Sequence, residues 1–359
     1  MICQNCFSYI QESGICQICG YTNNQATVNE SILPPMFVLN NRYRIGRTLG
    51  IGGFGITYVA QDMTNGTRCA IKELMPTQIA YREGTKVFCS QSDGAVFEHC
   101  KENFLAEAKM LQQVGSNPSV VKVQDSFYEN NTAYIVMELL LGETLRDKIK
   151  KFGGSLDYTM ATEMLLLTGS ALMTIHEKGI LHRDISPENI FCTLDNDYKL
   201  IDFGASRYYV SEKSQSLSIY LKPGFAPPEQ YSSKGNQGPW TDVYGLAATY
   251  YYTLTGNKLA DTMDRLSGVS YLSLREAIPG CPVKTSDAVD KALTLDYRKR
   301  YQTVSAFLSD LDLSQMIASS NVSSSNVMDK TDLGIRKSKN RKRISCLKRI
   351  WSSFLKKNK

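Results

Sequence analysis

The spacing of apolar residues divides the chain into a part with the period of strands and a part with the period of helices. Alternating apolar and polar positions, as at 43–45 and 57–59, dominate to about residue 140. Helical spacing, with apolar residues three and four positions apart, continues from about residue 143 to 312. We therefore expect an α+β fold in which a small β-rich lobe, residues 41–140, precedes a larger helical lobe, residues 141–313.

Two polar stretches mark the limits of this domain. The sequence 21–30 is polar and is followed by Pro34 and Pro35, which predicts a linker over residues 21–40. Serine and asparagine dominate 318–325, which predicts a second linker over residues 314–335. Residues 1–20 and 336–359 are thereby set apart as two terminal segments.

Composition places the chain among globular proteins. Hydrophobic residues make up 42% of its 359 residues and aromatic residues 10%, which is enough for a large core and excludes wholesale disorder. No run approaches the roughly 18 uncharged apolar residues of a membrane span. Cys3 and Cys6 stand where a signal peptide would carry its apolar region. We expect a cytoplasmic protein, in a reducing compartment where neighbouring cysteines more often bind metal than form disulfides.

Four cysteines dominate the first segment. Cys3 and Cys6 form one CxxC turn, and Cys16 and Cys19 form a second. Two such turns supply the four soft ligands of a tetrahedral Zn²⁺ site with no open position, so the predicted zinc is structural. A redox pair and disulfides are the alternatives. The segment resembles the zinc ribbons at the start of many bacterial proteins, and it could dock a partner or serve local order alone.

The net charge of +6 belongs to the last segment. Residues 336–359 hold eleven Lys and Arg and no acid, which leaves 30 basic against 35 acidic residues elsewhere. The apolar residues of 344–355 fall at helical spacing among these cations, which favours contact with an anionic membrane surface at the inner face of the membrane. An intramolecular or protein target is the first alternative, and nucleic acid is the less favoured one.

A set of short motifs stands in a fixed order along the middle of the chain. The first is a glycine-rich stretch that contains Gly50, Gly52, Gly53 and Gly55. It is followed by Ala70-Ile71-Lys72, His182-Arg183-Asp184 with Asn189, Asp202-Phe203-Gly204 and Pro227-Pro228-Glu229. Glycines of this kind let a backbone approach phosphate, although one such loop alone is weak evidence. In this order the motifs resemble those of eukaryotic-like protein kinases, bacterial members in particular, over residues 41–313.

The resemblance implies a bilobal protein-kinase fold and an ATP-dependent phosphotransferase. Such an enzyme uses Mg²⁺, or Mn²⁺ in its place, to transfer the γ-phosphate of ATP to a Ser or Thr hydroxyl of a protein substrate, and it often phosphorylates itself. The implied residues are Lys72 for the phosphates with Glu107 as its partner (Glu98 and Glu102 being weaker candidates), Met137 as gatekeeper, the backbone of Glu138 and Leu140 for adenine, Asp184 as proton acceptor, and Asn189 and Asp202 as magnesium ligands.

Further residues have implied structural and regulatory roles. Glu229 is expected to pair with Arg300, and Asp242 to brace the catalytic loop. His176 and His182 are interpreted as core histidines rather than as bases or ligands. A buried Arg183 would receive a phosphate from the activation segment, 205–221, where Ser218 occupies the usual position. The alternative is a solvated loop whose serines have no such role.

Two positions depart from the family pattern and predict an exchange of roles. Ser186 replaces the lysine that normally follows the catalytic aspartate by two residues, and Lys222 replaces a threonine that normally packs against that lysine. We expect Ser186 and Lys222 to be neighbours, with Lys222 supplying the cation for the γ-phosphate. The alternative is a solvated lysine beside a disabled loop, in which case the chain would be a nucleotide-binding pseudokinase. A nucleic-acid adaptor that uses the two terminal segments is a further alternative. The substrate and oligomeric state are not indicated.

Overall fold

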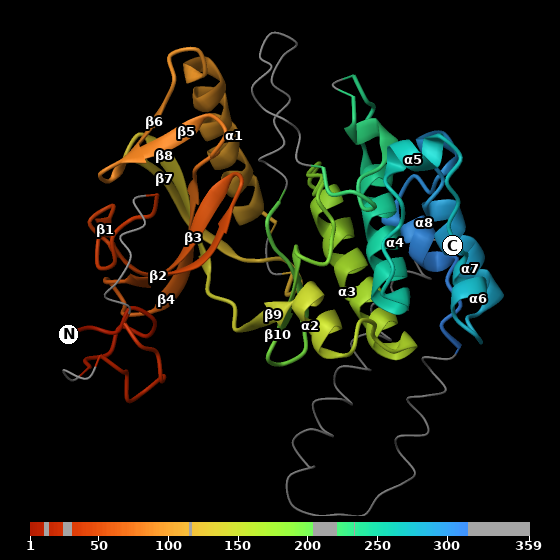
Figure 1. Ribbon diagram of the computed structural model, residues 1–359, viewed down its shortest axis with the longest axis horizontal. Coiled ribbons are helices and arrows are strands. Elements are labelled where there is room, and N and C mark those ends of the chain that lie inside the picture. The colour runs from red at the N-terminus through yellow and green to blue at the C-terminus, as the bar shows by residue number, and fades with distance from the viewer. Residues whose placement is uncertain (11–13, 24–30, 115–116, 204–220, 233, 315–359) are drawn as a thin grey trace, which may run out of the picture. The chain divides into compact units, whose positions relative to one another are not determined.

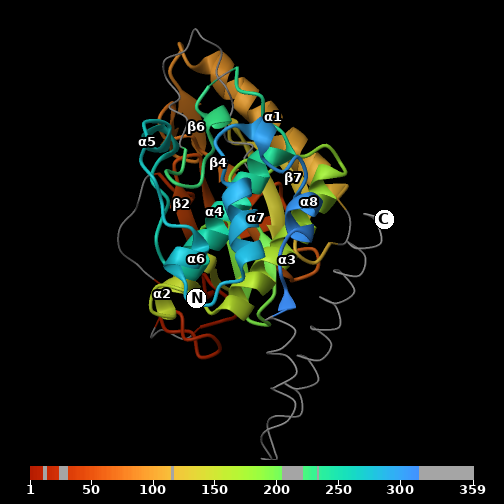
Figure 2. The same cartoon turned by 90° about the vertical axis from the view of Figure 1, so that its right-hand side faces the viewer.

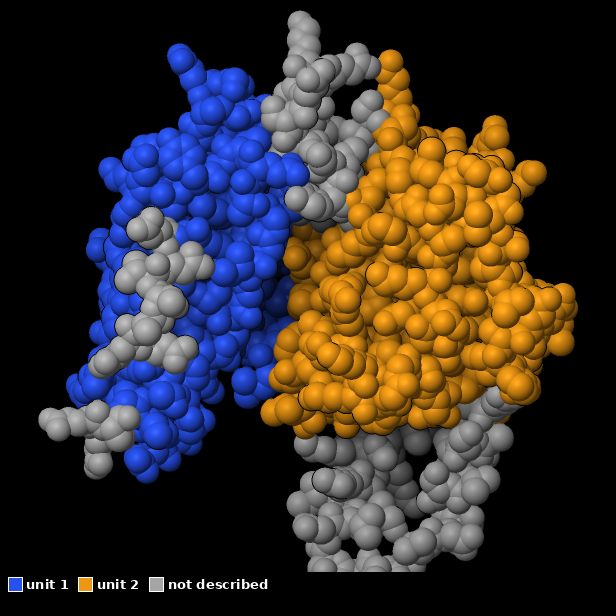
Figure 3. All heavy atoms as spheres, viewed as in Figure 1, with its two compact units in different colours: residues 1–116, 121–141, 205–219 blue, residues 117–120, 142–204, 220–359 orange. Residues whose placement is uncertain are grey.

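The structure, a computed structural model, describes residues 1–10, 14–23, 31–114, 117–203, 221–232 and 234–314. Gly204, Ser218, nearly all of the activation segment and the basic segment 336–359 with its predicted membrane contact therefore lie outside the described residues. The chain divides into two compact units, which Figure 3 shows in blue and orange. Unit 1 contains residues 1–116, 121–141 and 205–219, and unit 2 contains the remainder.

Unit 1 is built on an antiparallel six-stranded sheet (Figure 1). In spatial order its strands are β1 (Val38–Leu39), β2 (Tyr43–Gly52), β3 (Gly55–Asp62), β4 (Arg68–Leu74), β8 (Thr132–Glu138) and β7 (Val123–Glu129). A hairpin of β5 (Ala80–Glu83) and β6 (Lys86–Cys89) leads into α1 (Gly94–Gln112). The apolar face of α1, which includes Phe97, Phe104 and Leu111, is buried, and the helix packs on β7 and β8. The alternating pattern of the sequence thus becomes the β-rich lobe that was expected.

The first predicted linker is shorter than residues 21–40. Leu33 is buried and its amide donates to the Tyr58 hydroxyl at 3.1 Å, while the β1 strand pairs with β2. The polar composition and the two prolines suggested a free connection, but the apolar residues around them find partners on the sheet. The chain packs on unit 1 from Ser31 onward.

A buried polar cluster joins β3, β4 and β8, which are interior strands of the sheet, to β5. The Glu73 and Arg82 side chains, both fully buried, form an ion pair that joins β4 to β5. The Tyr58 and Tyr134 hydroxyls also donate to Glu73, at 2.9 and 2.5 Å. Arg82 Nε donates to the carbonyl of Ser31 at 3.0 Å. The cluster satisfies a buried carboxylate and fastens the hairpin and the preceding segment to the strand that carries Lys72.

Unit 2 is mainly helical (Figure 2). Its described residues form the helices α2 (Leu145–Lys151), α3 (Tyr158–His176), α4 (Pro239–Thr255), α5 (Thr262–Leu266), α6 (Leu274–Ala277), α7 (Val283–Ala292) and α8 (Val304–Ser309), and they include the 3-10 turns Pro228–Gln230 and Tyr297–Lys299. Helices α3 and α4 pack on one another, and α8 packs on both. A small sheet of β9 (Gly142–Thr144), β10 (Ile190–Thr193) and β11 (Tyr198–Leu200) lies beside them, in the order β11-β10-β9.

The α3 and α4 pair is the core of unit 2. Asp157 caps the N-terminus of α3, because its carboxylate accepts the amide of Met160, and Gly256, which has the left-handed φ of 71°, caps the C-terminus of α4. Nearly every residue of α4 from Thr241 to Leu254 is buried. Helical spacing in the sequence was therefore a correct indication of the larger lobe. Within the described ranges, no helix has the length and apolarity needed to span a bilayer.

The buried Glu73 and Arg82 pair generates a stability prediction. Arg82→Met leaves a carboxylate without its cation, and we expect the free energy of unfolding to fall by about 3–5 kcal/mol near pH 8. Burial raises the pKa of Glu73, whereas Arg82 and the two tyrosines oppose that rise. In the variant the folded state then binds a proton more tightly than the unfolded state does. Stability is therefore retained at low pH and lost as pH rises.

Urea unfolding followed by circular dichroism at pH 5 and pH 8 tests this expectation. The matched control is Glu73→Gln combined with Arg82→Met, which removes both charges and keeps an acceptor for the tyrosine hydroxyls. This double variant should be more stable at pH 8 than Arg82→Met alone. An equal loss of stability at the two pH values would contradict the assignment.

Candidate active site

The glycine-rich stretch forms the turn between β2 and β3. Gly52 and Gly55 are paired across the hairpin. A side chain at Gly55 would place its Cβ 2.3 Å from the carbonyl oxygen of Glu73, so only glycine fits there. The tip is tied to the end of β4, since the amides of Met75 and Thr77 donate to the carbonyls of Phe54 and Gly53. Gly50, Gly52 and Gly53 are exposed, which leaves the backbone accessible to a ligand.

Lys72 lies in the middle of the sheet, on β4. It is paired with Thr57 on one side and Ile135 on the other. Its Nζ lies 6.0 Å from the ring centroid of Phe104 on α1, and Glu107 follows Phe104 by one helical turn. Glu98, a weaker candidate for the partner, instead bonds Lys101 at 2.6 Å with a side chain that is 66% exposed. The proximity of Lys72 to Phe104 and the pairing of Glu98 with Lys101 therefore favour Glu107 over Glu98 as the expected partner.

The expected adenine-binding segment begins in the last residues of β8 and continues beyond it. Met137 is half-buried and paired with Ala70 and Val123. The amide of Glu138 donates to the carbonyl of Lys122 at 3.0 Å, and its Oε1 accepts the Lys122 amide at 2.9 Å. Because its amide already donates to Lys122, only the carbonyl oxygen of Glu138 is left for the expected hydrogen bond to adenine. Leu140 is half-buried just beyond the strand.

The loop of residues 180–189 in unit 2 is fixed by its backbone. Asp242 on α4 accepts the amide of His182 at 2.9 Å and that of Arg183 at 2.6 Å, and its Oδ2 lies 2.7 Å from His176 Nε2. Gln230 Nε2 donates to the carbonyl of Arg183 at 2.7 Å. Burial raises the pKa of Asp242, but the hydrogen bonds from the His176 side chain and from the His182 amide lower it by more, so the carboxylate stays ionised. The expected bracing by Asp242 is confirmed, whereas Gln230 was missed.

His182 is a structural residue of this loop. Its side chain is fully buried, with Nε2 at 3.1 Å from the Ile201 carbonyl and Nδ1 accepting the Asp184 amide at 3.3 Å. The ring lies 4.7 Å from that of Phe203. A ring nitrogen that accepts a hydrogen bond from an amide N–H must be unprotonated, so this arrangement requires a neutral imidazole. Burial lowers the pKa of His182 in agreement with this, and the core interpretation is confirmed.

Asn189 and Asp202 are brought together at the end of the loop. Asn189 Nδ2 donates to the carbonyl of Asp184 at 2.8 Å, which turns its Oδ1 away from that carbonyl. The Asn189 carbonyl accepts the amide of Ile201 at 3.0 Å, so the exposed Asp202 is its neighbour. Asp202 has a φ of 58°, in the left-handed region where strain often marks function. One amide oxygen and one carboxylate suit a hard cation such as Mg²⁺.

Arg183 differs from the expectation. Its side chain is exposed, and the prediction that it would be buried is wrong. The physical reason is its backbone, because Arg183 has a φ of 64° and both its amide and its carbonyl are held from within unit 2, which directs the side chain outward.

Lys222 and Ser186 are in direct contact. Lys222 Nζ donates to Ser186 Oγ at 2.7 Å and lies 3.6 Å from Asp184 Oδ2. Ser186 is fully buried, whereas the Lys222 side chain is 30% exposed and that of Asp184 is 20% exposed. The structure therefore places an ammonium beside the expected proton acceptor. The alternative of a lysine directed into solvent does not fit these distances.

Glu188 is a further residue near Lys222 that sequence reasoning missed. Its Oε1 bonds Arg146 at 2.6 Å and its Oε2 lies 3.8 Å from Lys222 Nζ. Burial raises the pKa of Glu188, but Lys222 and the other polar neighbours lower it more, and the carboxylate stays charged. The feature of the sequence that could have identified Glu188 is its position one residue before Asn189. Lys222 is thus surrounded by a hydroxyl and two carboxylates.

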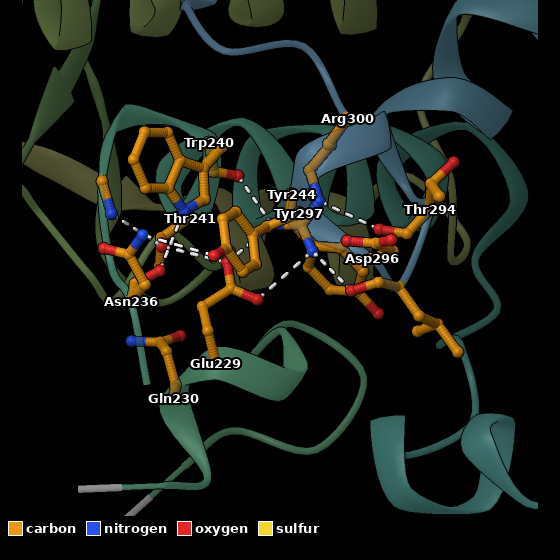
Figure 4. A network of polar contacts seen from close by, with 12 residues as sticks. Glu229, Gln230, Asn236, Trp240, Thr241, Tyr244, Thr294, Asp296, Tyr297 and Arg300 are labelled. Atoms are coloured by element: carbon orange, nitrogen blue, oxygen red, sulfur yellow. Dashed lines mark hydrogen bonds and ion pairs between the residues drawn. The ribbon is translucent and has the colours of Figure 1, made fainter. Parts of the chain in front are cut away.

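Glu229 and Arg300 form the expected pair (Figure 4). Arg300 NH1 donates to Glu229 Oε1 at 2.7 Å, and both side chains are buried. Arg300 also reaches the carbonyls of Trp240, Thr294 and Leu295, as the sticks in Figure 4 show in part. Every branch of the guanidinium is used, so the pair is fully satisfied. It connects the turn that carries Gln230 to the last helices of unit 2.

The four N-terminal cysteines converge in unit 1. Their sulfur atoms lie within 4.8 Å of one another, and all four are free cysteines. The amide of Asn5 donates to Cys3 Sγ at 3.4 Å and Asn5 Nδ2 to Cys19 Sγ at 3.6 Å, as suits thiolate ligands. The residues therefore fit a tetrahedral zinc ion, and these four cysteines form no disulfide in the structure.

Comparisons with known proteins agree on one family. The family model described as the protein kinase domain matches residues 43–311. The serine/threonine-protein kinase PknA of Nostoc sp. is 31% identical over 286 residues, which cover 77% of this chain and 48% of the relative. The serine/threonine-protein kinase B of Synechocystis sp. is also 31% identical, with 77% and 47% covered. This chain thus spans about half the length of these curated relatives.

A solved structure shares the fold. The chain described as the apo form of PpkA-294 has a TM-score of 0.71 and 34% identity to this protein. The alignment covers 79% of this chain and 100% of that one.

The neutral His182 generates a pH prediction. Because burial lowers its folded pKa, His182 contributes stability that is present above the unfolded value near 6.5 and is lost as pH falls below it. Between pH 7 and 5, wild-type stability should fall more steeply than that of His182→Phe, by at most about 1.4 kcal/mol per pH unit. Urea unfolding at several pH values measures the difference. The exposed His99→Ala is the control and should keep the wild-type slope; a wild-type slope in His182→Phe would contradict the argument.

Proposed function

The chain belongs to the protein kinase family, and from that membership we propose that it transfers the γ-phosphate of ATP to a serine or threonine hydroxyl of a protein substrate. The observation that carries the proposal is the fixed loop of unit 2. Asp242 holds its main chain, and Asp184 stands beside the Lys222 ammonium at 3.6 Å. Proton transfer needs a positioned carboxylate, and phosphoryl transfer needs a positioned cation.

Each unit supplies a different part of the reaction. In unit 1, the glycine hairpin and Lys72 would bind the ATP phosphates, with Glu107 holding Lys72 and the carbonyl of Glu138 and the backbone of Leu140 meeting adenine. In unit 2, Asp184 would orient the substrate hydroxyl and accept its proton. Asn189 and Asp202 would hold magnesium, which neutralises phosphate charge when it is bound.

The pseudokinase and nucleic-acid alternatives are less well supported. The pseudokinase reading began from the missing lysine at Ser186, but an ammonium stands at 2.7 Å from that hydroxyl. The nucleic-acid alternative uses both terminal segments, and its basic part, residues 336–359, lies outside the described residues. Relatives that carry the serine/threonine kinase description match the intervening domain at about 30% identity.

Two substitutions test the kinase mechanism. Lys72→Met removes the phosphate cation and Asp184→Asn removes the proton acceptor, so we expect each to abolish autophosphorylation. The assay is incubation with labelled ATP and magnesium, followed by mapping of the labelled residues. Circular dichroism should show that both variants remain folded. Retained phosphotransfer in both variants would refute the proposal.

We also propose that Ser186 and Lys222 exchange the roles of the usual lysine and threonine. Stabilisation of the transferring phosphoryl group depends on where a cation lies rather than on which segment carries it. Support comes from the 2.7 Å contact and from the carboxylates of Asp184 and Glu188, which hold the ammonium in place. In this proposal Lys222 supplies the positive charge from the opposite side of the site, whereas the usual lysine supplies it from within the loop.

The exchange predicts a coupled pair of substitutions. Lys222→Ala should lower kcat by about 10²-fold or more, comparable to the loss of one preorganised donor in a transition state. Ser186→Lys together with Lys222→Thr should recover more activity than either change alone, because the two residues are in contact. Steady-state kinetics on a protein substrate give both values. An active enzyme in which Lys222→Ala has no kinetic effect would rule out the exchange.

A further inference from the structure

The N-terminal segment with the four cysteines, here called the cysteine segment, packs against β2. This strand leads into the glycine-rich turn between β2 and β3, the glycine hairpin. The carbonyl of Gln4 accepts the amide of Arg47 at 2.7 Å, and Arg47 Nε donates to Asn5 Oδ1 at 2.7 Å. The Arg47 guanidinium also lies 5.8 Å from the ring centroid of Tyr21. Phe7, in the first cysteine turn, is buried. Both segments belong to unit 1, and the red N-terminal segment lies next to β2 in Figure 1.

Gly46 permits this close approach. A Cβ at this position would lie 2.2 Å from the carbonyl oxygen of Gln4 and 2.8 Å from Cζ of Phe7. The nearest atoms to that position all belong to the cysteine segment. The absence of a side chain at Gly46 is thus explained by the seated segment rather than by a turn, because its φ is not in the left-handed region.

The contact falls on an irregular point of β2. The pairing of β2 with β3 shifts between Ile45 and Thr48 and again between Thr48 and Gly50, so β2 carries extra residues there. A bulge bends a strand and frees backbone groups from the ladder. Here the amide of Arg47 is satisfied by Gln4. The segment therefore holds the bend just before Gly50 and Gly52.

The same turn that would hold zinc makes the contact. Gln4 and Asn5 stand between Cys3 and Cys6, and the amide and side chain of Asn5 bond the sulfurs of Cys3 and Cys19. A segment of this size depends on metal for its conformation. The position of the Gln4 carbonyl and of Asn5 Oδ1 therefore depends on the four-cysteine site.

We propose that Gln4, Asn5 and Gly46 are positioning residues for the nucleotide site, through which the zinc-bound cysteine segment fixes the glycine hairpin. The inference rests on the proposed function, in which this hairpin binds the ATP phosphates. A seated segment confines β2 to one bend. Release of the segment spreads the hairpin over several conformations, and the apparent affinity for ATP falls with the fraction that remains competent.

Gly46→Ala in the full chain separates seating from metal binding. The variant should keep one zinc per molecule, yet hydrogen exchange should rise at residues 44–52. The KM for ATP should increase about fivefold or more, with kcat nearly unchanged. Gly94→Ala is the matched control, because Gly94 has open space around its Cβ position and lies outside the proposed contact. It should behave as wild type.

Metal removal should give the same defect by another route. Cys3→Ser with Cys6→Ser should lose zinc and show the same exchange and KM as Gly46→Ala. Combining all three changes should add nothing, since the segment can be released only once. Asn5→Ala, which removes side-chain bonds without adding volume, is the variant to use if Gly46→Ala does not fold.

The possible outcomes separate this inference from the kinase proposal. Unchanged exchange at residues 44–52 in the zinc-free variant, or an unchanged KM in Gly46→Ala or Asn5→Ala, would overturn the positioning role. Additive defects in the combined variant would overturn it as well. A wild-type chain that does not bind ATP would refute the proposed function. In that case exchange alone still decides whether the segment holds β2.

Discussion

The buried carboxylate of Asp242 is the interaction on which the geometry of unit 2 depends. A charge taken out of water is costly unless donors surround it, and Asp242 receives the amides of His182 and Arg183 together with His176. Those two amides belong to the residues directly before Asp184. The electrostatic need of the carboxylate therefore dictates the path of the loop, including the left-handed Arg183. The orientations of Asp184 and Asn189 follow from that path.

Unit 1 repeats the same principle with Glu73. Its buried carboxylate is surrounded by Arg82, Tyr58 and Tyr134, and it directly follows Lys72 in β4. In both units a satisfied buried charge thus stands beside a residue expected to act on phosphate or proton. Such networks are rigid because losing any partner leaves an unpaired charge in a low dielectric. Rigidity of this kind keeps a functional side chain in one position, so the site does not have to reorganise during the reaction.

Sequence reasoning identified candidate residues where they stand close together along the chain. The glycine stretch, the loop of Asp184 and Asn189, and the cysteine turns each form a short motif, and family resemblance extended these to Asp242 and to Glu229 with Arg300. It did not find the pair of Glu73 and Arg82, the bond from Gln230 to Arg183, or the seat at Gly46. These contacts join segments without a shared motif, and their partners are chosen by packing. The burial of the Arg183 side chain was predicted wrongly because its left-handed φ could not be read from a motif.

The position of Lys222 depends on contacts that are separate from Asp242. Gly224 has a φ of 84° and would place a Cβ 2.5 Å from the Leu259 carbonyl, so the chain there runs tightly against its neighbour. Thr262 donates to the carbonyl of Ala226 at 2.6 Å. The expected base and the expected cation are therefore held by two sets of bonds, which are linked by Gln230, because it follows this segment in the chain and donates to the carbonyl of Arg183. They meet where Lys222 contacts Ser186 and approaches Asp184. A lysine within the loop would be positioned by the same bonds as the base. Lys222 is positioned by the bonds of its own segment as well, so the distance from Lys222 Nζ to Asp184 depends on both sets of bonds.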